Sequence, residues 1–164
     1  MLRINKFQLS FLVIVLLIIG FFRYFVFENI NVLLFNSLHH RQYQVPSFFN
    51  FMRDWSYSRL YFFKWILTLS FCTVFFFNQW LILKTIFTKK NTRIWLIYFY
   101  LILLLLSIVS FGIGYLINNP QGGYLFSRKF MGILQSPVPL MLLIPVGILK
   151  LKLENYDKER HRYL

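Results

Sequence analysis

Long runs of hydrophobic residues, interrupted by short polar segments, dominate this sequence of 164 residues. A helix needs about 20 apolar residues, within a range of about 17 to 25, to cross a hydrocarbon core about 30 Å thick. The stretches that meet this length are residues 7–27, 65–83, 94–117 and 130–151. They predict an all-α integral membrane protein with four transmembrane helices, forming a single transmembrane domain over residues 1–164.

The first stretch follows Arg3 and Lys6, as the apolar region of a secretory signal does. We nevertheless expect an uncleaved anchor, because the apolar run is longer than in a typical signal and no small-x-small cleavage site follows it.

The fourth stretch differs from the others because polar residues and prolines interrupt it. These residues are Gln135, Ser136, Pro137, Pro139 and Pro145. An interior proline removes a backbone donor and leaves a carbonyl without its partner, which lipid cannot replace. In one possible structure, Ser136 caps a short helix that starts at Pro137, and the preceding segment is re-entrant or interfacial. In the other, one kinked helix crosses the membrane and Gln135 bonds to a neighbouring helix. The fourth segment is therefore expected to be proline-kinked or partly re-entrant.

The distribution of Lys and Arg predicts the orientation, because cytoplasmic segments retain positive charge. Eleven of these residues fall on the side of both chain ends and seven on the other. Both termini should then be cytoplasmic, with a cytoplasmic tail at 152–164, a long outer loop at 28–64 and a short one at 118–129. The short loop contains NNPQGG, in which Pro120 fixes one φ angle and two glycines are free to take positive φ.

The outer loop is rich in apolar residues, and an interfacial helix capped by Ser47 is expected within it. An alternative interpretation makes Arg53, Asp54 and Arg59 part of an outward-facing binding surface.

Composition supports the membrane assignment. The chain is 58% hydrophobic and 14% charged, against about 45 to 50% and about 25% in soluble domains. The net charge of +13 is spread in short blocks between apolar runs, which favours membrane lipid and not nucleic acid as its partner.

Candidate chemistry is sparse. Cys72 is the single cysteine and lies in the middle of an apolar run, where we expect a buried structural thiol. His39 and His40 are adjacent, but their side chains should diverge, so we expect a turn and neither a metal site nor a cofactor. A membrane enzyme that acts on lipid-linked substrates is the least favoured function, because the outer side offers only Glu28, Asp54 and these two histidines as acid and base.

The third stretch carries small residues at helical spacing, Ser107, Ser110 and Gly114, which predict a face for close helix packing. No Asp, Glu or His lies within the apolar stretches, which argues against a pump or an autonomous transporter. A small transporter or channel subunit stays an alternative, and Gln135, Asn78 and Gln79 lining one water-filled cavity would support it.

The carboxy-terminal part resembles a known family. The residues that carry the resemblance are Arg128, Lys129, Phe130, Gln135, Ser136, Pro137 and the run LMLLIP that ends at Pro145. They are similar to the corresponding segment of small membrane proteins associated with bacterial exosortases of the F and X type in Bacteroidetes. The departure is a second proline, Pro139, after Gln135.

This resemblance implies a multi-pass protein of the bacterial inner membrane that works beside an exosortase, a larger polytopic cysteine transpeptidase-like enzyme. The expected role is that of a non-catalytic accessory or scaffold subunit in protein sorting. The candidates for partner docking are Arg128, Lys129, Gln135, Ser136, Pro137, Pro139 and Pro145, together with Arg53 and Asp54. Gln135→Leu or Pro137→Ala should then weaken partner association without preventing insertion.

Overall fold

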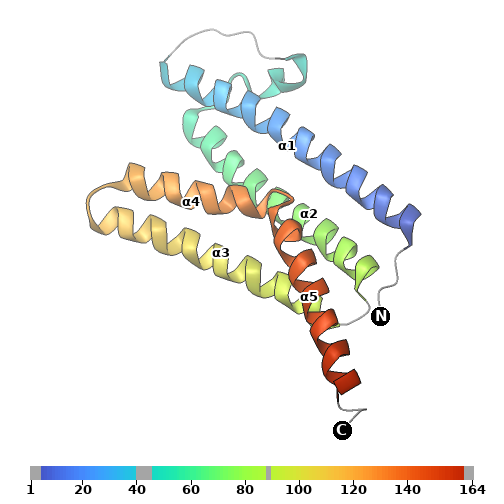
Figure 1. Cartoon of the computed structure of the whole chain (residues 1–164). Helices are drawn as coiled ribbons and strands as arrows, with labels where there is room; N and C mark the ends of the chain where they lie inside the picture. Colours follow the sequence, from blue (N-terminus) through green and yellow to red (C-terminus); the bar gives the residue numbers. More distant parts are fainter. Residues whose placement is uncertain (1–4, 40–45, 88–89, 161–164) are drawn as a thin grey trace.

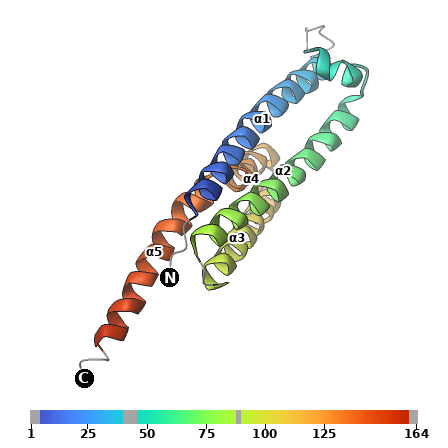
Figure 2. The same ribbon diagram turned by 90° about the vertical axis from the view of Figure 1, so that its right-hand side faces the viewer.

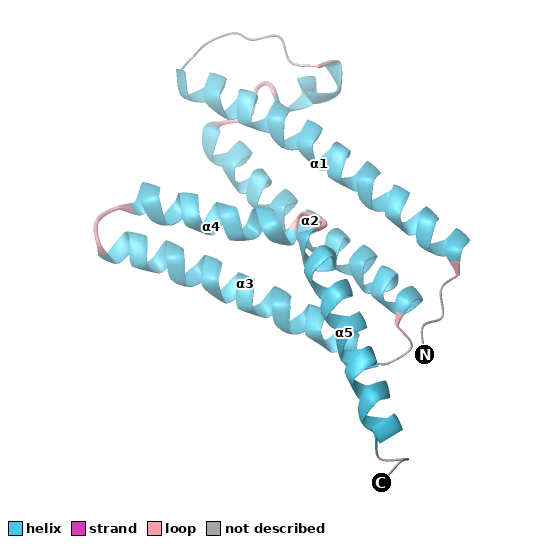
Figure 3. Cartoon of the chain, in the orientation of Figure 1, coloured by secondary structure: helices cyan, strands magenta, loops and turns pink. Residues whose placement is uncertain are grey.

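The computed structural model describes residues 5–39, 46–87 and 90–160, and all regular elements in these ranges are helical (Figures 1 and 3). In chain order they are α1 (Lys6–His39), the 3-10 helix η1 (Ser47–Met52), α2 (Tyr57–Ile86), α3 (Lys90–Leu116), α4 (Pro120–Leu134) and α5 (Val138–Arg160). The prediction of an all-α fold is confirmed.

The long helices have the length and hydropathy of membrane spans. Within the described residues, α1, α2 and the part of α3 from Arg93 to Leu116 each meet this criterion. The segments Pro120–Leu134 and Val138–Leu153 meet it only as a pair, and they are bent by 57° at the break between them. The chain is therefore an all-α membrane protein, and its described residues hold three continuous candidate spans and one bent helix pair that can make a fourth.

The break combines features of both structures considered for the fourth segment. The hydroxyl of Ser136 accepts a hydrogen bond of 3.3 Å from the amide of Val138, as in the capped short helix. Gln135 reaches across to α2, as in the kinked helix, because its Nε2 donates to the carbonyl of Thr68 at 2.7 Å.

The outer segment 28–64 differs from the loop that was expected, because α1 continues to His39 and α2 already begins at Tyr57. The physical reason is burial: Ile30 is fully buried and Leu60 is 1% exposed, so residues beyond the first apolar stretch still pack into the α1–α2 contact. Where an interfacial helix capped by Ser47 was expected, the structure has the short η1, whose N-cap residue is Pro46.

Helices α3 and α4 form an antiparallel pair in close contact (Figure 1). Their turn places Asn118 at a φ of 54°, while none of the described glycines has positive φ. The side chain of Asn119 then caps α4 by accepting a hydrogen bond from the amide of Gly122 at 3.0 Å. A Cβ atom built on Gly114 would lie 2.4 Å from Cα of Gly123, so the two backbones approach as closely as glycine allows.

Helix α5 leaves the bundle after the break and extends past the other helices (Figure 2). In both ribbon views, the first turn of α1 and the last turn of α5 lie toward the same end of the molecule, opposite η1. The described chain therefore begins α1 and ends α5 on the same side of the helix bundle.

Candidate functional site

The break between α4 and α5 exposes backbone carbonyls that other helices satisfy. The hydroxyl of Tyr100 on α3 donates to the carbonyl of Leu134 at 2.8 Å. The side-chain Nε2 of Gln79 on α2 donates to the carbonyl of Ser136 at 2.7 Å. Because lipid offers no donors, these contacts allow irregular backbone to exist inside the bundle. They also fix the position of the break relative to α2 and α3.

Gln135 is the centre of a second set of contacts. Its Oε1 accepts a hydrogen bond of 2.6 Å from Nε of Arg23 on α1, while its Nε2 donates to Thr68 and lies 3.2 Å from Sγ of Cys72. The side chain is 3% exposed. One amide therefore joins α1 and α2 to the break, and Cys72 is one of the groups against which it packs.

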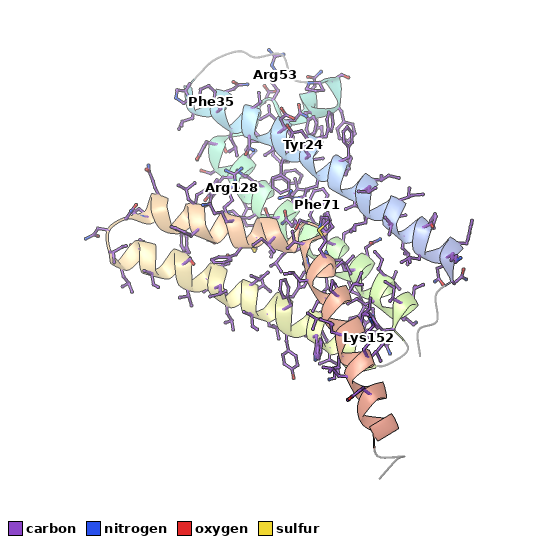
Figure 4. The ribbon with its side chains drawn as sticks, in the orientation of Figure 1. Tyr24, Phe35, Arg53, Phe71, Arg128 and Lys152 are labelled. Atoms are coloured by element: carbon purple, nitrogen blue, oxygen red, sulfur yellow. The ribbon has the colours of Figure 1, made fainter. Side chains whose placement is uncertain are left out.

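A cavity of about 310 Å³ lies between α1, α2 and α4, with Gln135 among its lining residues. Its volume falls in the range of about 300 to 1,000 Å³ typical of small-molecule sites. The cavity takes one cation from each helix: Arg23 from α1, Lys64 from α2 and Arg128 from α4. Figure 4 shows Arg128 on the side of α4 that faces α2.

The hydrogen bonds of two of these cations go to neutral groups. Arg23 donates to the amide oxygen of Gln135, and Nζ of Lys64 donates to Oδ1 of Asn31 at 2.8 Å. The guanidinium of Arg23 also lies 5.4 Å from the centre of the Phe27 ring. These contacts orient the cationic side chains without cancelling their charge.

The remaining lining residues are mainly aromatic or neutral. They are Tyr24, Phe27, Asn31, Tyr61, Trp65, Thr68, Tyr124, Ser127, Met131 and Gly132, with Glu28 as the single acid. A second hollow, of about 410 Å³, shares Asn31, Tyr61, Lys64, Tyr124 and Arg128 with the cavity and continues along α1 past Leu34 to Leu38. The cationic cavity therefore extends toward the end of the bundle where η1 lies.

The docking candidates occupy different environments. Arg128, Lys129 and Pro145 are exposed, and Ser136 and Pro137 are partly buried. Gln135 and Pro139 are buried inside this chain and have no free surface for another protein, and Gln135 also holds the break through its hydrogen bonds. Arg53 and Asp54 are exposed beside η1 and are not among the residues that line the cavity (Figure 4).

The packing candidates lie at the contact between α3 and α4. The hydroxyls of Ser107 and Ser127 are 2.7 Å apart. A Cβ atom built on Gly123 would lie 2.8 Å from the carbonyl oxygen of Ser110 and 2.7 Å from Cα of Gly114.

The polar set proposed for a channel does not share one cavity. Gln135 lines the cavity described above, whereas Asn78 and Gln79 are absent from its lining. Gln79 is instead fully buried and bonded to the break.

Metal-ligating side chains are not gathered in the described part of the chain, which holds no group of three or more His, Cys, Asp or Glu residues in suitable positions. His39 ends α1, stacks on Phe35 with ring centres 4.2 Å apart, and has its Nδ1 3.0 Å from the Phe35 carbonyl oxygen. His40 lies outside the described residues.

Sequence reasoning missed the cavity itself. The sequence predicted Arg128 as a docking candidate and Glu28 as an acid available to a membrane enzyme, but it did not place them in one cavity with Arg23 and Lys64. The available signal was their position: each cation lies near an end of a different apolar stretch, and the antiparallel course of the helices brings these ends to one level.

Comparison of the chain with protein-family models, with curated proteins and with solved structures finds no match.

Proposed function

We propose that this chain is a non-catalytic accessory or scaffold subunit of an exosortase-type protein-sorting system in the bacterial inner membrane, with both termini in the cytoplasm. The resemblance of residues 128–145 suggests this system. The observation that carries the docking role is the exposed proline of α5.

Pro145 lies inside α5 and is exposed. It removes the amide that would otherwise donate to the carbonyl of Met141, one turn earlier, and Met141 is 66% exposed. Inside the membrane, a carbonyl without a hydrogen-bond donor is unfavourable, because the surrounding lipid has no donor to offer. A protein partner packed on this face can supply the missing donor, which favours docking of a polytopic membrane protein on α5.

The fixed break makes α5 suitable for this role. Contacts from Tyr100, Gln79 and Gln135 hold the start of α5 in place, so its exposed face has a defined orientation before any partner binds. Preorganisation of this kind reduces the ordering cost of association. Lys129 is exposed on α4, the first helix of the bent pair. Its Nζ lies 5.3 Å from the centre of the Phe126 ring, and it adds a cation to this helix.

The test is affinity purification of the tagged chain from native membranes in mild detergent, followed by mass spectrometry. We expect stoichiometric recovery of a larger polytopic membrane protein of the exosortase type. Pro145→Ala restores the amide donor within α5, and we expect it to reduce partner recovery by about fivefold, the equivalent of one hydrogen bond.

Leu105→Ala is the matched control, because Leu105 is 60% exposed on α3, outside the proposed docking face. It should leave recovery of the partner unchanged. Recovery of the chain alone as a discrete homo-oligomer would contradict the accessory role, and flux measurements on a channel would then be the next step.

A further inference from the structure

We propose that the cavity between α1, α2 and α4 binds a phosphate group carried by a membrane lipid headgroup. This inference goes beyond the accessory role and does not depend on it, because it concerns the isolated chain and its lipid.

The residues that line the cavity give it a net positive charge. Three cations and one carboxylate line the cavity, so its formal charge is positive even with Glu28 ionised. The hydrogen bonds of Arg23 and Lys64 go to neutral amide oxygens. Half-buried cations held in this way favour an anion that adds charge-assisted hydrogen bonds. Donors that converge from three helices match the several oxygens of a phosphate.

The three cations of the cavity lie at similar positions relative to the apolar stretches. Arg23 lies near the outer end of the apolar stretch 7–27, Lys64 directly precedes the stretch 65–83, and Arg128 lies two residues before the stretch 130–151. On the spans predicted from the sequence, all three cations lie at the boundary between hydrocarbon and headgroups. The phosphates of membrane lipids lie at this level.

The walls of the cavity combine apolar and polar groups. A volume of about 310 Å³ exceeds what a bare phosphate fills, and Phe27, Trp65 and Met131 add apolar surface. Tyr24, with the other lining tyrosines, combines an aromatic ring with a hydroxyl (Figure 4). Amphipathic walls of this kind suit a headgroup whose phosphate is joined to a glycerol and acyl chains. Free phosphate would use the cations but not the apolar walls.

The experiment uses the purified full chain reconstituted in vesicles of phosphatidylcholine with a minor fraction of phosphatidylglycerol. After gentle extraction, native mass spectrometry measures the lipid retained by each molecule. We expect phosphatidylglycerol to be enriched over its share of the vesicle. Lys64→Gln and Arg128→Gln should each weaken its retention about tenfold, the equivalent of one charge-assisted hydrogen bond.

Lys84→Gln is the matched control, since it removes the same charge as Lys64→Gln from an exposed lysine of α2 that does not line the cavity. It should retain lipid as the unchanged chain does. Arg128 is exposed, so its variant should fold even if Lys64→Gln does not.

Two results would overturn the proposal. One is equal retention of lipid by the unchanged chain and both cavity variants. The other is displacement of the lipid by inorganic phosphate at comparable concentration, which would assign the cavity to free phosphate and remove the lipid as its source.

Discussion

Nε of Arg23 donates a hydrogen bond of 2.6 Å to Oε1 of Gln135, although the two residues are 112 positions apart in the chain. This contact connects the cation in the first span to the break in the fourth. It gives the guanidinium a fixed acceptor on one side and leaves the rest of the group beside the cavity.

Loss of the Gln135 amide should destabilise the helix bundle. Gln135→Leu removes the acceptor of Arg23 and the donor to Thr68, so we expect a loss of about 2 kcal/mol in the free energy of unfolding. Denaturation in mixed micelles measures it. Gln8→Leu makes the same change at an exposed position of α1 and should shift stability by less than about 0.5 kcal/mol. Equal effects of the two variants would contradict the assigned role of Gln135.

The burial of Gln135 changes what the substitution Gln135→Leu tests. On the sequence alone, Gln135→Leu was a test of partner docking, whereas a buried Gln135 affects the fold of this chain first. Weaker partner recovery in that variant would therefore be indirect.

The hydroxyl of Tyr100 should stabilise the break itself. Tyr100→Phe keeps the ring, which packs 5.0 Å from Phe76, and removes the donor to the Leu134 carbonyl. We expect a loss of about 1 to 2 kcal/mol, because the carbonyl is left buried without this partner. Hydrogen exchange should also increase at the amides around the break while remaining unchanged in α1. Unchanged exchange at the break would contradict this account of how it is held.

Two glycines of α3 should respond oppositely to alanine. Gly114→Ala places a Cβ 2.4 Å from the backbone of Gly123, so α3 and α4 must separate and stability should fall by about 1 to 3 kcal/mol. Gly112→Ala has no atom within 4 Å of the new Cβ and should stabilise the helix by about 0.5 to 1 kcal/mol. Thermal denaturation of both variants measures the difference. Similar shifts of the same sign would contradict the close packing of the two helices.

The single acid of the cavity should weaken the binding of anionic lipid. Glu28→Gln removes a negative charge from the lining, so we expect retention of phosphatidylglycerol to increase several-fold. Asp54→Gln removes a charge that does not line the cavity and serves as the control. Lower retention in Glu28→Gln would show that the carboxylate takes part in binding.

Hydropathy was sufficient to predict the all-α fold, and the prolines and polar residues of the fourth apolar stretch predicted its irregular structure. Hydropathy failed at residues 28–39 and 57–64, because these parts of α1 and α2 mix polar and apolar residues and their burial arises only from helix pairing. The turn residue with positive φ is Asn118 and not a glycine, since Gly122 and Gly123 are used inside α4.

The site could be predicted only in part. The amide of Gln135 was recognisable as a group that bonds across helices, but its partners Arg23 and Thr68 are far away in sequence. The cavity depends on the way α1, α2 and α4 converge, and no local pattern encodes that arrangement.

Photo-crosslinking in native membranes tests the proposed docking face at a single position. A photoreactive residue at 141, on the exposed face beside Pro145, should give a crosslinked product with a polytopic membrane protein. The same photoreactive residue at position 105, where Leu105 is 60% exposed on α3, should give crosslinks to lipid alone. Lipid crosslinks alone from both positions would contradict the accessory role of this chain.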